Sequence, residues 1–180
     1  MSSVAKRIAL IGNPNAGKSS LFNELTGLRQ QIGNFPGVTV EKYTGQMSLN
    51  NGDPIEVIDL PGTYSLHVAT EDERVVVDFL TKTSIEDYPQ LFLYVADASN
   101  LERNLLFFSQ LRDIQLPMAL VITMEDVVRK HNGHIDIAGL QSVLQIPVVS
   151  VNARTGEGVE ALNALIEAHT ATPDVQGIQQ

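Results

Sequence analysis

Short runs of apolar residues alternate along the chain with segments in which apolar residues recur at helical spacing. Continuous apolar runs at 91–96 and 118–122 predict strands that are buried on both faces of a sheet. In 71–82, apolar positions three and four residues apart predict a helix. The same two patterns predict further strands at 7–11, 38–49, 55–59 and 148–151, and further helices at 18–25, 101–111, 137–144 and 159–168. This alternation predicts an α/β fold with a mostly parallel sheet and helices on both faces.

One connection departs from this alternation. The predicted strands at 38–49 and 55–59 are joined through Asn50-Asn51-Gly52-Asp53, which is typical of a tight hairpin turn. We therefore expect a six-stranded sheet with one antiparallel strand, in a single domain over 1–169. From 170 to 180 the apolar periodicity is lost, which predicts a disordered tail.

Composition narrows the function classes. The 180 residues carry a net charge of −9, which gives no support for a nucleic-acid partner. The chain has no cysteine, which excludes disulfides and thiolate metal sites. No apolar run approaches the roughly 18 residues that a membrane span needs, so we expect this chain to be soluble.

A glycine-rich turn between the first predicted strand and the first predicted helix carries the clearest chemical signal. Residues Gly12-Asn13-Pro14-Asn15-Ala16-Gly17-Lys18-Ser19 match the pattern G-x-x-x-x-G-K-S without a gap. Backbone N–H groups of such a loop surround a phosphate, and the helix N-terminus adds the positive end of its dipole. Lys18 is expected to reach the β and γ phosphates. The predicted phosphate-binding residues are Asn13, Asn15, Ala16, Gly17, Lys18, Ser19 and Ser20.

A second part of this site is predicted directly after the strand at 55–59, in Asp59-Leu60-Pro61-Gly62. An aspartate at a strand end can hold Mg²⁺ through water, while the Gly62 N–H contacts the γ-phosphate. This tetrapeptide alone is also a plain turn sequence. Its position downstream of a phosphate loop makes the functional interpretation the stronger one.

The segment Gly33-Asn34-Phe35-Pro36-Gly37-Val38-Thr39-Val40 lies between these two motifs. Its glycines and proline suit a loop that becomes ordered or released with nucleotide state, and a static surface loop is the alternative. The Thr39 hydroxyl is a candidate Mg²⁺ ligand. We expect catalysis to depend on Lys18, Thr39 and Gly62, and Mg²⁺ to be held by Ser19, Thr39 and Asp59.

The segment expected to read the base departs from the usual pattern. GTPases of this class recognise guanine with N-K-x-D after a buried strand, and the equivalent here is Thr123-Met124-Glu125-Asp126. Asp126 keeps the carboxylate that accepts from guanine N1–H and the exocyclic amine, but Thr123 lacks the asparagine amide. One lost hydrogen bond costs about 1–3 kcal/mol, or roughly tenfold to a hundredfold in affinity. We expect weakened binding with guanine still favoured over adenine.

The last loop expected at the base lies within 150–158. Ala153 and Arg154 keep the common S-A-R pattern, whereas Asn152 replaces its serine. The predicted base-binding residues are Thr123, Met124, Asp126, Asn152, Ala153 and Arg154.

These motifs resemble the N-terminal G domain of the FeoB family of ferrous-iron transporters. The resemblance rests on the phosphate loop, on 33–41 and on 59–66, and it continues through Glu71-Asp72-Glu73-Arg74 to about residue 166. It implies a P-loop NTPase fold of the Ras-like type. It also implies a regulatory domain of a bacterial Fe(II) transport system that binds GTP and GDP and hydrolyses GTP slowly.

The resemblance implies further roles. Asn15 looks like the asparagine that ligates an activating K⁺, with backbone carbonyls near Gly33 and Phe35, where the family often carries tryptophan. Thr63 stands where Ras-like enzymes place the water-orienting glutamine, so backbone and cation would position the water. The family continues into a membrane permease, which is therefore an expected partner at the cytosolic face of the inner membrane; the oligomeric state stays open. Iron itself is not expected to bind, because the histidines lack metal-ligand spacing: His67, His131, His134 and His169.

Two other functions remain open. Thr63, Thr123 and Asn152 are compatible with a degenerate nucleotide-sensing module that hardly turns over. An Era-like assembly GTPase shares the asparagine of the phosphate loop, but the acidic charge and the missing RNA-binding module disfavour it. Relaxed nucleotide specificity is a variant of the main hypothesis.

Overall fold

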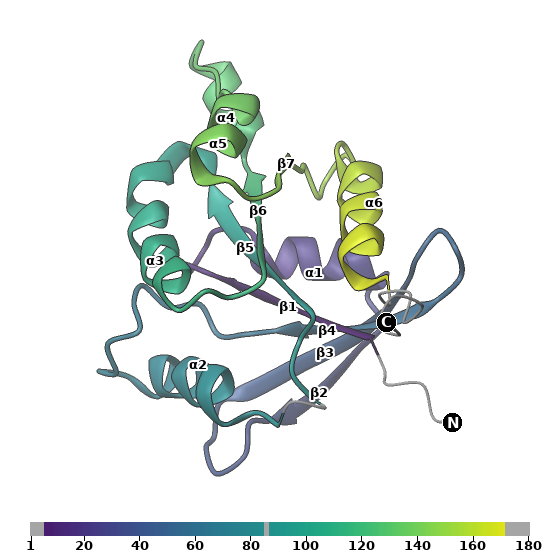
Figure 1. Cartoon of the computed structure of the whole chain (residues 1–180), viewed down its shortest axis with the longest axis vertical. Helices are drawn as coiled ribbons and strands as arrows, with labels where there is room; N and C mark the ends of the chain where they lie inside the picture. Colours follow the sequence, from purple (N-terminus) through teal and green to yellow (C-terminus); the bar gives the residue numbers. More distant parts are fainter. Residues whose placement is uncertain (1–5, 85–86, 172–180) are drawn as a thin grey trace, which may run out of the picture.

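A seven-stranded sheet forms the middle layer of the molecule (Figure 1). This computed structural model describes residues 6–84 and 87–171. The strand order is β2-β3-β4-β1-β5-β6-β7. The strands are β1 (Lys6–Gly12), β2 (Gln30–Asn34), β3 (Glu41–Ser48), β4 (Pro54–Asp59), β5 (Leu91–Asp97), β6 (Met118–Thr123) and β7 (Val148–Ser150).

The strand count corrects the prediction of six. The additional strand is β2, which pairs antiparallel with β3. All of its residues are exposed, so it has no apolar alternation by which the sequence could reveal it. It includes Gly33 and Asn34, which had been assigned to a loop. The expected antiparallel strand is β3, which runs against both β2 and β4, while the remaining pairs are parallel.

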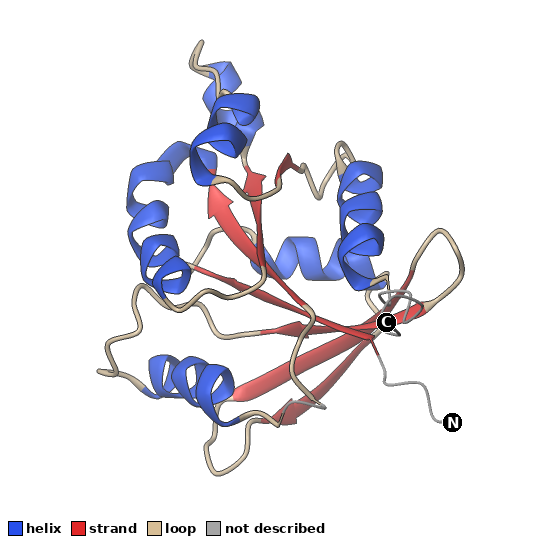
Figure 2. Ribbon diagram, viewed as in Figure 1, coloured by secondary structure: helices blue, strands red, loops and turns tan. Residues whose placement is uncertain are grey.

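Helices cover both faces of the sheet, as predicted (Figure 2). Apolar residues of α1 (Lys18–Thr26) and α6 (Val159–Thr170) pack on one face. The other face is covered by α2 (Glu71–Lys82), α3 (Leu101–Asp113) and α5 (Ile137–Leu144). A short 3₁₀ turn, η1 (Ala98–Asn100), and a short helix, α4 (Glu125–Lys130), were not anticipated.

The predicted disordered tail lies almost wholly outside the described residues. Within it the structure describes only Thr170, which closes α6, and Ala171.

The parallel direction of five strands explains why the functional residues meet at one end of the sheet. Every residue of β5 and β6 is buried, and burying each large apolar side chain contributes about 1.5–3 kcal/mol. Because β4, β1, β5, β6 and β7 are mutually parallel, the loops that follow them lie at the same edge of the sheet. The phosphate loop, the Asp59–Gly62 segment and both segments expected at the base lie at or directly after the ends of these strands, whereas the segment 33–40 does not.

The start of α2 is fixed by a capping box. The Thr70 hydroxyl accepts from the Glu73 backbone N–H, and the Glu73 carboxylate accepts from the backbone N–H groups of Ala69 and Thr70. These hydrogen bonds hold the pKa of Glu73 below its ordinary value. The cap therefore fixes where the chain leaves 59–69 and enters α2.

Candidate nucleotide site

The phosphate loop is shaped by two positions with left-handed backbone. Asn15 has φ 62° and Gly17 has φ 89°, and alternation of this kind turns successive N–H groups toward one side. Gly12 lies against β5 so closely that a Cβ atom would sit 2.3 Å from the Val95 carbonyl oxygen. The loop thus forms a backbone concavity at the end of β1.

This concavity opens onto the beginning of α1. The N-cap is Gly17, which makes no side-chain cap, so the first N–H groups of the helix have no intrahelical partner. Ser19 and Ser20 are exposed there, as is Asn15, whereas Lys18 is buried. The predicted phosphate residues therefore surround a helix N-terminus that favours an anion.

Lys18 faces Asp59 across the site. Its Nζ lies 3.8 Å from Asp59 Oδ1, and both side chains are largely buried. That oxygen has no hydrogen-bond partner. Burial raises the pKa of the Asp59 carboxyl, and the Lys18 ammonium only partly opposes this. Carboxylate and hydroxyl oxygens are ligands that Mg²⁺ prefers, so the Asp59 carboxylate, whose Oδ1 makes no hydrogen bond, and the exposed Ser19 fit this ion by their chemistry.

The segment after Asp59 is laid against the phosphate loop. The Leu60 N–H donates to Leu10 at 3.0 Å, and the Thr63 N–H donates to Gly12 at 3.2 Å. A Cβ atom on Gly62 would lie 2.9 Å from Pro14 Cα. The structure thus brings Asp59 to Lys18 and Gly62 to Pro14 of the phosphate loop. The Thr63 hydroxyl is also buried there and has no hydrogen-bond partner.

The segment 35–40 lies on α2 instead. Phe35 is buried and packs edge-to-face on Phe79, with ring centroids 6.4 Å apart. Its carbonyl accepts from the Val38 N–H at 3.3 Å. The Thr39 hydroxyl donates to Glu71 at 3.4 Å. Phe35 and Thr39 thus contact α2, while Gly33 lies in β2. The roles predicted for these three residues at bound cations stay predictions.

The predicted base residues do come together. They line a hollow of about 140 Å³ between α1, α4 and the loop after β7. Asp126 is 43% exposed there, and its neighbour Lys130, 3.6 Å away, is itself exposed, so this carboxylate stays accessible. The lining residues are Gly17, Ser20, Thr123, Met124, Asp126, Val127, Val151, Asn152, Ala153 and Arg154.

The two departures from the usual base pattern have structural roles. The buried Thr123 hydroxyl lies 2.7 Å from the Ala16 carbonyl oxygen and 3.2 Å from that of Ala96. Its single proton therefore ties the end of β6 to the phosphate loop. The Asn152 side-chain oxygen accepts from the Arg154 backbone N–H at 3.0 Å, and the Asn152 backbone N–H donates to the Glu157 backbone carbonyl at 2.9 Å. Asn152 thus shapes its own loop.

Sequence reasoning missed two supporting groups. The first group joins α4 to the loop after β7 and consists of Glu125, Arg129, Ser150 and Glu157. Its only sequence signal is the four-residue spacing of Glu125 and Arg129. The second group centres on the buried Tyr94.

The Tyr94 hydroxyl donates to the Asn104 carbonyl at 2.5 Å and lies 3.3 Å from Asn13 Oδ1. Burial raises the pKa of Tyr94. Tyr94 gave no local signal, because it sits inside an apolar strand. Through these contacts it connects α3 to the phosphate loop.

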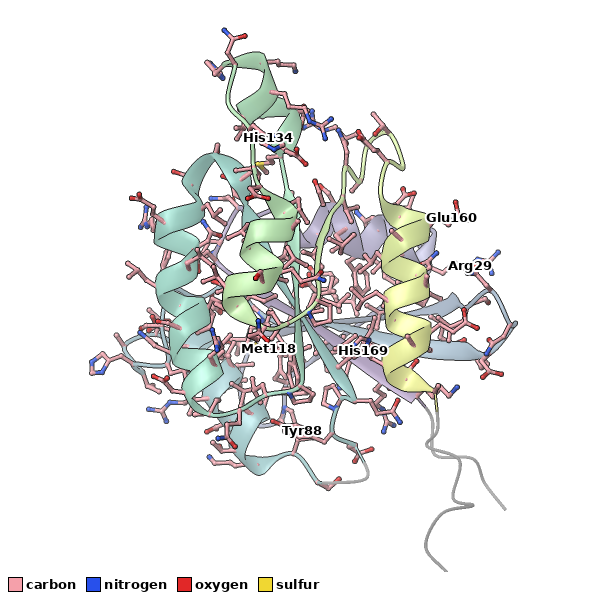
Figure 3. All side chains as sticks on the ribbon, turned by 45° about the horizontal axis from the view of Figure 1, so that its top comes forward. Arg29, Tyr88, Met118, His134, Glu160 and His169 are labelled. Atoms are coloured by element: carbon pink, nitrogen blue, oxygen red, sulfur yellow. The ribbon has the colours of Figure 1, made fainter. Side chains whose placement is uncertain are left out.

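The histidines do not gather. His134 follows α4, and His169 lies near the far end of α6, well apart in Figure 3. Across residues 6–84 and 87–171, no group of three or more His, Cys, Asp or Glu side chains is placed to hold a metal ion. In the same residues, no helix combines the length and apolar character of a membrane span.

This arrangement defines a class. A phosphate loop after β1, an Asp-x-x-Gly segment laid against it and a hollow at the end of β6 make this chain a P-loop domain with the Ras-like G-domain fold. Residues 6–166 match the family model described as ferrous iron transport protein B. The chain therefore belongs to the FeoB family, in its N-terminal G domain, as the motifs predicted.

Curated relatives agree with this assignment. The chain is 44% identical over 161 residues to the Fe(2+) transporter FeoB of Leptospira biflexa, covering 89% of this chain. It is 40% identical over 173 residues to the Fe(2+) transporter FeoB of Salmonella typhimurium, covering 94% of this chain. It spans only 23% and 22% of the length of these two relatives.

Solved structures confirm the fold. The G domain of the T. maritima FeoB iron transporter superposes with a TM-score of 0.83 at 41% identity, covering 92% of this chain and 98% of that one. A mutant of S. thermophilus NFeoB bound to GDP gives 0.81 at 40% identity, covering 92% of this chain and 62% of that one.

Proposed function

We propose that this chain is the guanine-nucleotide switch of a bacterial Fe(II) transport system, which binds GTP and GDP with Mg²⁺ and hydrolyses GTP slowly. The observation that carries the proposal is the pairing of Lys18 with Asp59 in front of the phosphate loop. The buried Lys18 ammonium and the buried Asp59 carboxylate form an ion pair, and Asp59 Oδ1 still lacks a hydrogen bond, so the polar groups of this site are incompletely satisfied. An anion beside Lys18 and a cation beside Asp59 would complete it.

The phosphate half of the site then works by position and charge. Ser19 and Asp59 would hold Mg²⁺, which supplies neutralisation of the phosphate charge. Lys18 stays buried and needs no large movement to exchange Asp59 for a phosphate oxygen. The Gly62 N–H lies beside the phosphate loop, because Gly62 packs on Pro14, and it is the donor for the γ-phosphate.

The base half would read guanine through Asp126, which accepts from N1–H and the exocyclic amine. Backbone N–H groups around Ala153 would meet the guanine carbonyl. Thr123 is bonded to Ala16 and offers the base no amide, so affinity falls below that of a site with asparagine. Guanine stays favoured over adenine, and relaxed use of other nucleotides is a variant of this proposal.

Hydrolysis would be slow and stimulated by K⁺. The position of the water-orienting glutamine is taken by Thr63, whose buried hydroxyl is too short to replace that side chain. Asn15 would ligate K⁺ together with carbonyls of Gly33 and Phe35, once Phe35 leaves α2. Thr39 would complete the Mg²⁺ site in the same movement, by exchanging Glu71 for the ion.

The link to iron transport comes from the relatives, which are Fe(2+) transporters several times longer than this chain. The permease part of such a transporter is the proposed partner, with this domain on its cytosolic side. Membership of the FeoB family removes the support for an Era-like assembly GTPase. A nucleotide sensor with almost no turnover remains the second candidate, because Thr63 offers no replacement for the glutamine.

Phosphate release from GTP and from ATP, in K⁺ and in Na⁺ with Mg²⁺, tests the proposal. We expect K⁺-stimulated release from GTP that is lost in Lys18→Met. Binding of GDP should also raise the melting temperature, since a ligand at about 100 times its Kd stabilises by about 2.7 kcal/mol. GDP binding without K⁺-dependent turnover would establish the sensor instead, and the absence of both would refute a nucleotide function.

A further inference from the structure

A buried carboxylate joins the two segments that line the base hollow. Glu125 is the first residue of α4 and immediately precedes Asp126. Its side chain is only 9% exposed. A carboxylate in such a place is stable only where hydrogen bonds and an opposite charge replace water. The partners that surround it therefore indicate what it holds.

Those partners lie on both sides of the hollow. One carboxylate oxygen accepts from the hydroxyl of Ser150, the last residue of β7. The other accepts a hydrogen bond from Arg129 Nε at 3.2 Å and lies 3.2 Å from a terminal nitrogen of the same guanidinium. Ser150 stands two residues before Asn152, where the loop at the hollow begins. Glu125 thus connects the helix that carries Asp126 to the root of the opposing loop.

Arg129 extends the connection to the far end of that loop. Its other terminal nitrogen lies 3.3 Å from the Glu157 carboxylate. The backbone carbonyl of Glu157 accepts from the Asn152 N–H at 2.9 Å. This outer ion pair is exposed and therefore weak on its own. The buried bond between Glu125 and Ser150 is the stronger part of the connection.

The C-terminal half of the helix is anchored by Val128, which packs against the core, whereas its first turn depends on the Glu125 connection. α4 has only six residues, and a helix of that length is not stable by itself in water. Its N-cap, Met124, adopts φ 57° and makes no side-chain cap. Thr123, the residue before it, is bonded to the phosphate loop. The orientation of Asp126 therefore depends on what holds Glu125.

We propose that Glu125 is a positioning residue for base selectivity, which holds Asp126 and the loop Asn152–Arg154 at a fixed separation through Ser150 and Arg129. This role rests on the proposed function, because it requires that the hollow takes a guanine base. Glu125 does not touch the base itself. It keeps the Asp126 carboxylate where the N1–H and amine of guanine reach it.

The test compares GDP with inosine diphosphate, which lacks the exocyclic amine that Asp126 accepts. The native chain should prefer GDP by about tenfold or more, the worth of one hydrogen bond to a charged group. In Glu125→Ala the preference should fall below about threefold, because Asp126 loses its fixed position. Ser150→Ala removes one bond only and should give an intermediate preference.

A matched control separates positioning from stability. Asp136→Ala removes the N-cap of α5, where the carboxylate accepts from the Gly139 N–H at 2.9 Å. It should lower the melting temperature and leave the preference for GDP unchanged. Glu125→Gln keeps an oxygen acceptor for Ser150, so it should retain most of the preference, and the melting temperature of Glu125→Ala shows whether that variant is folded.

The outcomes are distinct. A native preference for GDP that Glu125→Ala and Ser150→Ala both retain refutes the positioning role and leaves the proposed function standing. If Glu125→Ala does not fold, Ser150→Ala decides alone: a native preference for GDP in Ser150→Ala refutes the role. No GDP binding by the native chain refutes the proposed function itself.

Discussion

Replacing Thr123 by valine tests the interpretation that this residue supports the phosphate loop. The Thr123 hydroxyl lies 2.7 Å from the Ala16 carbonyl oxygen and is buried. Valine has nearly the same shape, so the substitution removes the donor without opening a cavity. The Ala16 carbonyl is then left with one donor fewer, inside a loop whose N–H groups must surround a phosphate.

The expected cost follows from that geometry. Leaving a buried acceptor unsatisfied costs about 1–3 kcal/mol, which for a domain of this size lowers the melting temperature by about 2–4 °C per kcal/mol. Since the disturbed group belongs to the phosphate loop, Thr123→Val should weaken the binding of GDP and the binding of inorganic pyrophosphate by the same factor. A residue that contacts the base would change GDP alone.

Thermal unfolding and competition binding with these two ligands check this prediction. Thr123→Ser is the control, because it keeps the hydroxyl and removes only a methyl group, worth about 0.8 kcal/mol. A Thr123→Val variant with the melting temperature of the native chain would contradict this role of Thr123. So would a variant that binds GDP more weakly but keeps its affinity for pyrophosphate.

Three further substitutions test other parts of the account. Gly62→Ala should weaken the binding of GDP by about tenfold or more, because its Cβ would lie 2.9 Å from Pro14 Cα. Calorimetry measures this affinity. The control Gly33→Ala, which has open space around the added Cβ, should leave the affinity for GDP unchanged. Phe35→Ala should lower stability by about 3 kcal/mol and speed hydrogen exchange in 35–40 but not in β5; unchanged exchange there would contradict the anchoring on α2. Glu73→Ala should destabilise the domain at pH 7. Because the pKa of Glu73 is lowered on folding, its contribution is present above the ordinary value of 4.5 and lost as pH falls through the lower folded value. The difference in the free energy of unfolding between Glu73→Ala and the native chain, measured in urea, should therefore disappear on acidification. A difference that persists at low pH would argue against the capping box.

The sequence predicted those parts of the molecule whose physical cause is local. The phosphate loop is contiguous, and its glycines are required by the backbone at Gly12 and Gly17. The central strands were evident because burial on both faces demands unbroken apolar runs. Helix α5 begins and ends at the predicted residues, because the Asp136 cap and the apolar spacing both favour a helix over the same residues.

The rest depends on contacts between distant positions. Strand β2 is exposed throughout, so only backbone pairing with β3 defines it. Helix α4 is too short to show a period. The bond from Thr123 to Ala16 crosses 107 positions, and no local pattern indicates that a threonine at the base motif faces the phosphate loop. Glu125 occupies the variable position of the expected base motif, and no local pattern indicates its bond to Ser150.

The most direct test of the central claim is a calorimetric titration of the native chain and of Thr123→Asn with GDP and with ADP, in K⁺ buffer with Mg²⁺. An asparagine amide has two N–H donors, so it can bond to the Ala16 carbonyl and still reach a base. We expect the native chain to bind GDP in preference to ADP, and Thr123→Asn to bind GDP about tenfold or more tightly. Equal affinities for GDP and ADP in the native chain, or no gain in Thr123→Asn, would contradict the assignment of a guanine site weakened at Thr123.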